Sequence, residues 1–187
     1  MKKNVITAVL TLIVFTIFLG FIYPLVITGI AQVMFPFQSN GSLIIKDGHI
    51  IGSELIGQSF TDIRYFHGRP SSINYDASNS GGSNFGPMNK TFMKRIEDQI
   101  KIIRADNNLS SDLFIPGDII TSSASGLDPH ISPESAKIQI NRIARIRGIP
   151  KNKLDELIMT YMEHPISGGH YVNVLKLNLA LDMLGAK

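Results

Sequence analysis

The chain has 187 residues, of which 44% are hydrophobic, and carries a formal net charge of +3. Lys2 and Lys3 supply two of the 18 basic residues, so the remaining 16 stand against 15 Asp and Glu, a balance that excludes nucleic-acid binders, which neutralise many phosphates. The absence of cysteine excludes disulfides, thiol catalysis and thiolate metal sites.

The N-terminal part of the chain is almost wholly apolar from Val5 to Met34. A helix of about 20 apolar residues crosses the hydrocarbon core of a bilayer, so this run is long enough for one span. We therefore assign residues 1–37 to a membrane anchor, with the span at about 5–30. Residues 38–187 then form a soluble domain of ordinary single-domain size.

A cleaved signal peptide is the alternative, since Gly29-Ile30-Ala31 loosely matches a cleavage site. The apolar core of a signal peptide has about 7–15 residues, much less than this run, so a retained anchor is favoured. Lys2 and Lys3 place the N-terminus in the cytoplasm, and the soluble domain then lies outside the membrane. Tyr23-Pro24 inside the run is compatible with a kink or with a proline tolerated in a packed helix.

The soluble part begins with a predicted β-hairpin. Two short apolar runs, 43–45 and 49–51, flank Asp47-Gly48, which is a strong hairpin-turn signal. Residues 61–89 follow, rich in Gly, Ser, Asn and Pro but interleaved with Tyr65, Phe66, Tyr75 and Phe85. A loop of this length with embedded aromatics is expected to be ordered, packed and functional.

Asn89 is expected to cap a helix from Lys90 to about Ala105, because apolar residues there recur at helical spacing. After the Pro116-Gly117 turn, residues 119–121 are a candidate short strand.

Ser132-Pro133-Glu134 is typical of a helix start, with Ser at the N-cap and Glu in the first turn. This helix is expected to run to Gly148, and Pro150 to open another. Residues 172–184 fit both a strand and a helix, and we favour a short strand that leads into a helix. The predicted fold is therefore one transmembrane helix plus one mixed α/β (α+β) extracytoplasmic domain.

The loop 122–136, SSASGLDPHISPESA, contains the residue types of a hydrolase triad: Ser123 or Ser125, Asp128 and His130. Triad members are recognised by geometry and are usually remote in sequence, and no Gly-x-Ser-x-Gly elbow is present. The better-supported interpretation is a turn that leads into the Ser132-capped helix.

Two segments contain residue types that are found in other kinds of ligand site. Asp128 and His130 provide fewer ligands than a zinc site needs, so we expect no metal site. The Gly-rich loop Ser80, Gly81, Gly82, Ser83 and Asn84 has backbone N–H groups for an anion, but it lacks the Gly-Lys-Ser/Thr ending of a P-loop and is favoured as a tight turn.

One basic run is opposed only by Glu134. Such a run is usually the solvated face of a helix, but beside a membrane it also suits acidic lipid headgroups or the carboxylates of a partner. It comprises Lys137, Arg142, Arg145, Arg147, Lys151 and Lys153.

Several short motifs occur in order along the chain. They are Tyr23-Pro24-Leu25, Ile56-Gly57-Gln58-Ser59-Phe60, Arg69-Pro70-Ser71, Ser80-Gly81-Gly82-Ser83-Asn84, Ser125-Gly126-Leu127-Asp128-Pro129-His130 with its flanks Ser123 to Pro133, Gln139, Arg142 and Val172-Asn173-Val174-Leu175. Together they closely resemble the C subunit of the Kdp potassium-transporting ATPase, the KdpC family. The resemblance covers essentially the whole chain.

This resemblance implies an accessory, non-catalytic subunit of a high-affinity, ATP-driven K⁺ uptake complex in the cell membrane. Its partners would be a channel-like A subunit, a P-type ATPase B subunit and a small F subunit. The family is described as a catalytic chaperone that raises the ATP affinity of the ATPase subunit, and its Ser80–Asn84 loop is linked to nucleotide. Residues 125–130 would form the subunit-contact loop.

The charge pattern of the N-terminus argues against direct nucleotide contact. If the N-terminus is cytoplasmic, the loop 80–84 lies across about 30 Å of hydrocarbon from cytosolic ATP. We therefore expect no tightly bound cofactor in this chain, with ATP and K⁺ handled by the complex. Any effect on ATP affinity would be allosteric.

Overall fold

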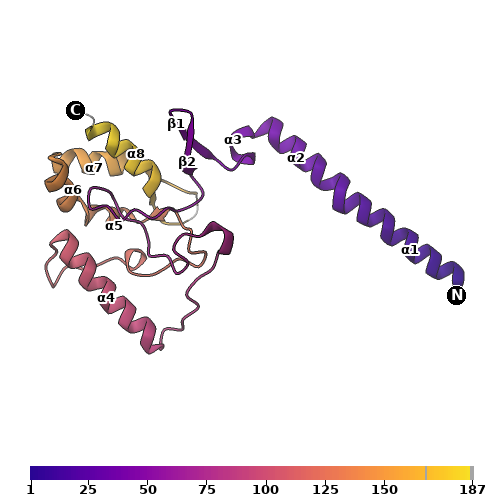
Figure 1. Ribbon diagram of the computed structural model, residues 1–187, viewed down its shortest axis with the longest axis horizontal. Coiled ribbons are helices and arrows are strands. Elements are labelled where there is room, and N and C mark those ends of the chain that lie inside the picture. Colours follow the sequence, from indigo (N-terminus) through magenta and orange to yellow (C-terminus); the bar gives the residue numbers. More distant parts are fainter. Residues whose placement is uncertain (167, 186–187) are drawn as a thin grey trace. The chain divides into compact units, whose positions relative to one another are not determined.

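The computed structural model describes residues 1–166 and 168–185. The chain divides into two compact units, Met1–Ile50 and a second one from Ile51 onward. In Figure 1 the indigo to violet helix belongs to the first unit, the boundary along the chain falls within the hairpin that follows it, and the second unit is a mixed helix and strand domain. One long apolar helix and one mixed helix and sheet domain confirm these two parts of the predicted fold class, whereas the extracytoplasmic placement of the domain stays a prediction.

The first unit is a 33-residue helical run, Lys2–Met34, long and apolar enough to cross a membrane. It consists of α1 (Lys2–Ile17), the π-helical turn η1 (Phe18–Ile22) and α2 (Tyr23–Met34), and a short α3 (Pro36–Ser39) follows. Pro24 lacks an N–H and its ring crowds the preceding turn, so the wider π turn before it accommodates the ring without ending the helix.

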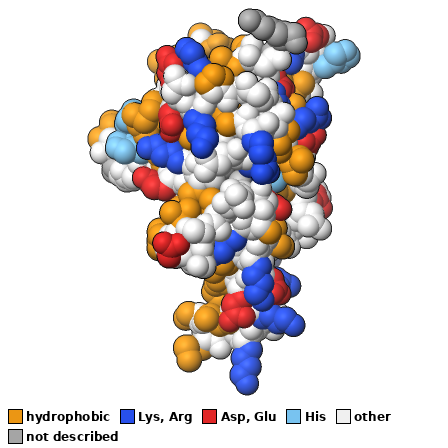
Figure 2. Space-filling view, turned by 90° about the vertical axis from the view of Figure 1, so that its left-hand side faces the viewer, with side chains coloured by type: hydrophobic (Ala, Val, Ile, Leu, Met, Phe, Trp, Pro, Cys, Tyr) orange, Lys and Arg blue, Asp and Glu red, His pale blue; other side chains and the backbone are white. Residues whose placement is uncertain are grey.

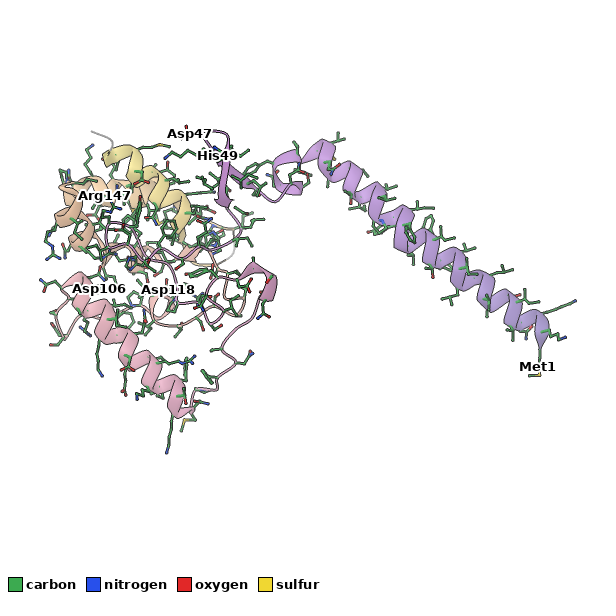
Figure 3. The ribbon with its side chains drawn as sticks, in the orientation of Figure 1. Met1, Asp47, His49, Asp106, Asp118 and Arg147 are labelled. Atoms are coloured by element: carbon green, nitrogen blue, oxygen red, sulfur yellow. The ribbon has the colours of Figure 1, made fainter. Side chains whose placement is uncertain are left out.

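The predicted hairpin is confirmed as β1 (Leu43–Lys46) and β2 (His49–Ser53). Asp47 and Gly48 both have positive φ, 51° and 77°, which is the backbone of a type I′ turn. Figure 3 labels Asp47 and His49 at this turn.

The second unit contains a small antiparallel sheet in the order β3-β5-β4. Its strands are β3 (His130–Ile131), β4 (Met162–Glu163) and β5 (Tyr171–Asn173). Val172 of the central strand pairs with both Ile131 and Met162, and it is fully buried. The sheet therefore joins the end of the 122–131 loop to the C-terminal part of the chain.

Four helices pack with this sheet: α5 (Pro133–Lys137), α6 (Ile140–Arg147), α7 (Lys151–Thr160) and α8 (Val174–Gly185). The buried core is largely aliphatic. Its fully buried members include Phe66, Ile143, Leu154, Ile158, Leu177 and Leu181. Strand β5 continues directly into α8, which confirms the strand-to-helix interpretation of 172–184.

Two local predictions were wrong. The helix expected from Ser132 to Gly148 is interrupted at Ile138 and Gln139, where the N–H of Gln139 bonds three residues back to Ala136. Residues 119–121 do not form a strand: Ile119 is the last residue of a 3₁₀ turn, η3 (Gly117–Ile119), and is buried in a second small core with Ile103. Tertiary packing overrides the β-propensity of a short apolar run there.

The predicted helix after Asn89 and the irregular segment 61–89 are confirmed. Helix α4 (Lys90–Asn107) begins at Asn89, whose side chain accepts from the N–H groups of Thr91 and Phe92. Residues 61–89 contain one short 3₁₀ turn, η2 (Ala77–Asn79), and are otherwise irregular.

Candidate functional site

The Gly-rich loop 80–84 and the loop 122–128 lie against each other, although sequence reasoning treated them separately. The N–H of Gly81 and the hydroxyl of Ser80 both donate to the carbonyl oxygen of Ser125, at 2.9 and 3.0 Å. A Cβ on Gly82 would lie 2.9 Å from the carbonyl oxygen of Ala124. Glycine at this position therefore permits close contact with a second backbone, and the N–H of Gly81 is not free for an anion.

Gly126 is the tightest point of this contact. Its φ is +69°, and a Cβ there would lie 2.6 Å from a side-chain carbon of Ile73 and 2.8 Å from the carbonyl oxygen of Gly81. The hydroxyl of Ser71 donates to the carbonyl oxygen of Gly126 at 2.8 Å. Both the backbone conformation and the space require glycine.

Asp128 is the charged centre of the site. Arg69 donates to its carboxylate at 2.9 Å, the backbone N–H of His130 donates at 3.0 Å, and Nδ1 of His130 lies 3.5 Å away. Partial burial would raise the pKa of Asp128, but the hydrogen bonds from His130 and Arg69 outweigh this and lower it to about 2. The carboxylate is therefore ionised and internally paired at neutral pH.

These residues line an open depression of about 660 Å³. Its wall includes Ser80, Ser123, Ser125, Leu127, Asp128 and Pro129, together with Leu55, Ile56 and Arg69. The depression is wide and open, unlike the enclosed pockets that hold small ligands.

The triad residue types do not assemble into a catalytic arrangement. Ser125 Oγ accepts from the N–H of Leu127 at 3.1 Å and lies 3.5 Å from Ser123 Oγ. Within residues 1–166 and 168–185, no hydrogen bond joins the His130 ring to either hydroxyl. The serines act as turn residues, as the sequence favoured.

Asp118 holds the start of α5 and was missed as a site residue in the sequence. Its carboxylate accepts from the backbone N–H of Ser132 at 2.6 Å and from the hydroxyl of Ser135 at 2.7 Å. Ser132 itself caps the N–H of Ser135 at 3.1 Å. Figure 3 labels Asp118, which comes from η3. The loop 122–131 is thus held in place at its C-terminal end as well.

Buried amide side chains hold the segment before the Gly-rich loop. Asn178 bonds both the N–H and the carbonyl of Phe66, at 2.8 and 2.9 Å. Gln139 bonds both backbone groups of the next residue, His67, at 2.8 and 3.1 Å. These side chains take the place of a neighbouring strand, which is how an irregular segment satisfies buried polar groups.

Arg142 completes this network, so the predicted basic run is not one solvated face. Its guanidinium is buried and donates to Asn107, Gln139 and the carbonyl of Ile63. Arg147, labelled in Figure 3, pairs with Asp182 at 2.9 Å. On the face in Figure 2, basic and acidic side chains are interspersed. Among the described residues, no group of three or more His, Asp or Glu could hold a metal ion.

Comparison with known proteins identifies the family. The family model "K+-transporting ATPase, c chain" (KdpC) matches residues 5–183. The chain is 48% identical to a potassium-transporting ATPase KdpC subunit from Koribacter versatilis, over 97% of this chain and 95% of that one. A KdpC subunit from Caldanaerobacter subterraneus subsp. tengcongensis is 47% identical, over 90% of this chain and 89% of that one. A KdpC subunit from Mycobacterium bovis is 43% identical, over 98% of this chain and 100% of that one. The chain therefore belongs to the KdpC family, which confirms the resemblance found in its motifs.

Proposed function

From its membership of the KdpC family, we propose that this chain is a non-catalytic accessory subunit of an ATP-driven K⁺ uptake complex. Its partners are a channel-like subunit that carries K⁺, a P-type ATPase subunit and a small F subunit. The depression around Asp128 is a contact surface for one of these partners.

The contact between the loops 80–84 and 122–128 is the observation that supports this proposal. The hydroxyls of Ser80 and Ser125 and the N–H groups of Gly81 and Gly126 bond within the fold, and Asp128 is paired with Arg69. A catalytic site needs a nucleophile and a base within hydrogen-bond reach, and a phosphate loop needs free N–H groups. An open surface whose central carboxylate is already paired with Arg69 suits protein contact instead.

We also propose that the domain lies outside the membrane, with Lys2 and Lys3 in the cytoplasm. The loop 80–84 then cannot contact cytosolic ATP. The catalytic-chaperone effect becomes an allosteric coupling, in which this subunit binds one state of the pump more tightly than another.

Cysteine labelling tests the topology, because the chain has no cysteine of its own. Asn79→Cys, at an exposed position beside the Gly-rich loop, should react with a membrane-impermeant maleimide in intact cells. Lys3→Cys should react only after permeabilisation. Labelling of Lys3→Cys in intact cells, with Asn79→Cys labelled only after permeabilisation, refutes the proposed topology. The loop 80–84 would then lie on the same side of the membrane as cytosolic ATP.

Co-purification tests the contact surface. Leu55 lines the depression and is 60% exposed, so Leu55→Asp should release the partner subunits without changing the unfolding temperature. Met159 is 54% exposed on α7 and does not line the depression, so Met159→Asp is the matched control. Equal retention of partners by both variants contradicts the assigned surface, and a wild-type chain that captures no pump subunit contradicts the proposed function.

A further inference from the structure

Two histidines outside the candidate site face each other where strand β4 ends and strand β5 begins. In the ladder, Met162 pairs with Val172 and Glu163 with Tyr171. His164 and His170 occupy the next position of the same register. Side chains directly opposite in an antiparallel pair are close neighbours, so the backbone holds these two rings together.

The two rings are exposed, and their Nδ1 atoms lie 2.9 Å apart. The ring planes meet at 71°, with centroids 4.5 Å apart. At this distance one Nδ1 carries a proton and the other supplies a lone pair, or both lone pairs point at a shared third atom. Neither histidine is buried, so a hydrated ion can reach the pair from solvent.

The separation of the two nitrogens matches the spacing of adjacent ligands on a metal ion. With metal–nitrogen bonds of about 2.0–2.1 Å, two ligands at a right angle are about 2.9 Å apart, and tetrahedral ligands about 3.4 Å apart. Imidazole nitrogen is a preferred ligand for nickel, copper and zinc, whereas magnesium and calcium prefer oxygen.

We propose that His164 and His170 form a two-histidine site for a divalent transition-metal ion, with Cu²⁺ and Ni²⁺ bound more tightly than Zn²⁺ or Mn²⁺. The ion replaces the shared proton, and water fills its remaining positions. The neighbouring carboxylate, Glu163, lies 3.4 Å from Lys176 and belongs to the opposite face by strand alternation.

Metal binding at this site acts on the sheet that supports the candidate contact surface. The ion would link β4 to β5, and β5 also pairs with β3, where His130 follows Asp128. In addition, the N–H of Val174 at the end of β5 bonds the carbonyl of Pro129 at 2.9 Å. A ligand that binds only the folded sheet stabilises it by mass action, so the ion stabilises the strand that supports this loop.

Titration of the full-length chain in detergent, purified with a tag that contains no histidine, tests this site. Ni²⁺ or Cu²⁺ should bind with a stoichiometry of one per chain by calorimetry and raise the unfolding temperature, whereas Mg²⁺ should do neither. His164→Ala and His170→Ala should each weaken binding about tenfold or more. His49→Ala removes an exposed histidine elsewhere and should leave binding unchanged.

Three outcomes overturn the proposal. They are the absence of saturable binding in the wild-type chain, equal binding in the His164→Ala/His170→Ala double variant, and a loss with His49→Ala as large as with the proposed ligands. Folding of each variant is checked by circular dichroism without metal, so a folding defect is not scored as lost binding.

Discussion

Asn178→Ala should destabilise the second unit strongly, because one side chain supplies the partners of two buried backbone groups. Asn178 is 2% exposed and bonds the N–H and carbonyl of Phe66, whose side chain is fully buried. A buried polar group left without a partner costs about 1–3 kcal/mol, so the two together cost about 4 kcal/mol. For a chain of this size, that lowers the unfolding midpoint by roughly 10 °C.

The measurement is unfolding of the full-length chain in detergent, followed by far-UV circular dichroism since the chain has no tryptophan. Asn152→Ala is the matched control, because Asn152 is exposed on α7, and it should change stability by less than about 0.5 kcal/mol. If Asn178→Ala is as stable as the control, the two hydrogen bonds do not hold the segment around Phe66, and the argument for an ordered loop 61–89 fails.

Three further predictions use the same unfolding measurement. Gly126→Ala should lower the free energy of unfolding by more than about 2 kcal/mol, because its Cβ would meet neighbouring atoms at 2.6 and 2.8 Å. Gly148→Ala, at φ +65° with open space, should lower it by about 1 kcal/mol, and equal losses would contradict the close-contact argument. The pKa of Asp128 lies below its ordinary value of 3.8, so its ionised form stabilises the fold above that pH, and this contribution is lost as the pH falls towards about 2. In Asp128→Asn the free energy of unfolding should therefore fall less steeply over this acidic range. Asp118→Ala removes the acceptor for the N–H of Ser132 and should cost about 2 kcal/mol, and a neutral result would remove Asp118 from the support of α5.

Features of the fold with a local chemical cause were predictable from the sequence. The hairpin turn at Asp47-Gly48, the caps at Asn89 and Ser132 and the apolar span each depend on residues within a few positions of one another. Side-chain hydrogen bonds to nearby N–H groups and positive φ at glycine act over the same short range. A pattern in the sequence therefore reports them directly.

The interruption of the helix at Gln139 shows where local signals end. The apolar residues keep their helical spacing before and after Gln139, and nothing in this pattern indicates that the helix is interrupted. Gln139 bonds backbone groups of His67, which is 72 residues earlier in the chain. Arg142, one turn later, looks like a solvated basic residue in sequence, yet it is 2% exposed. Long-range partners of this kind leave no mark on neighbouring positions.

The sequence by itself determined the apolar helix, the order of most local elements and, through its motifs, the family. Only the tertiary structure decided that the loops 80–84 and 122–128 form one surface, and that Gln139 and Arg142 are buried against backbone groups of the segment 63–67. The physical reason is separation along the chain. Periodicity, caps and turns act between neighbours, whereas these contacts join backbones and side chains that only the packed core brings together.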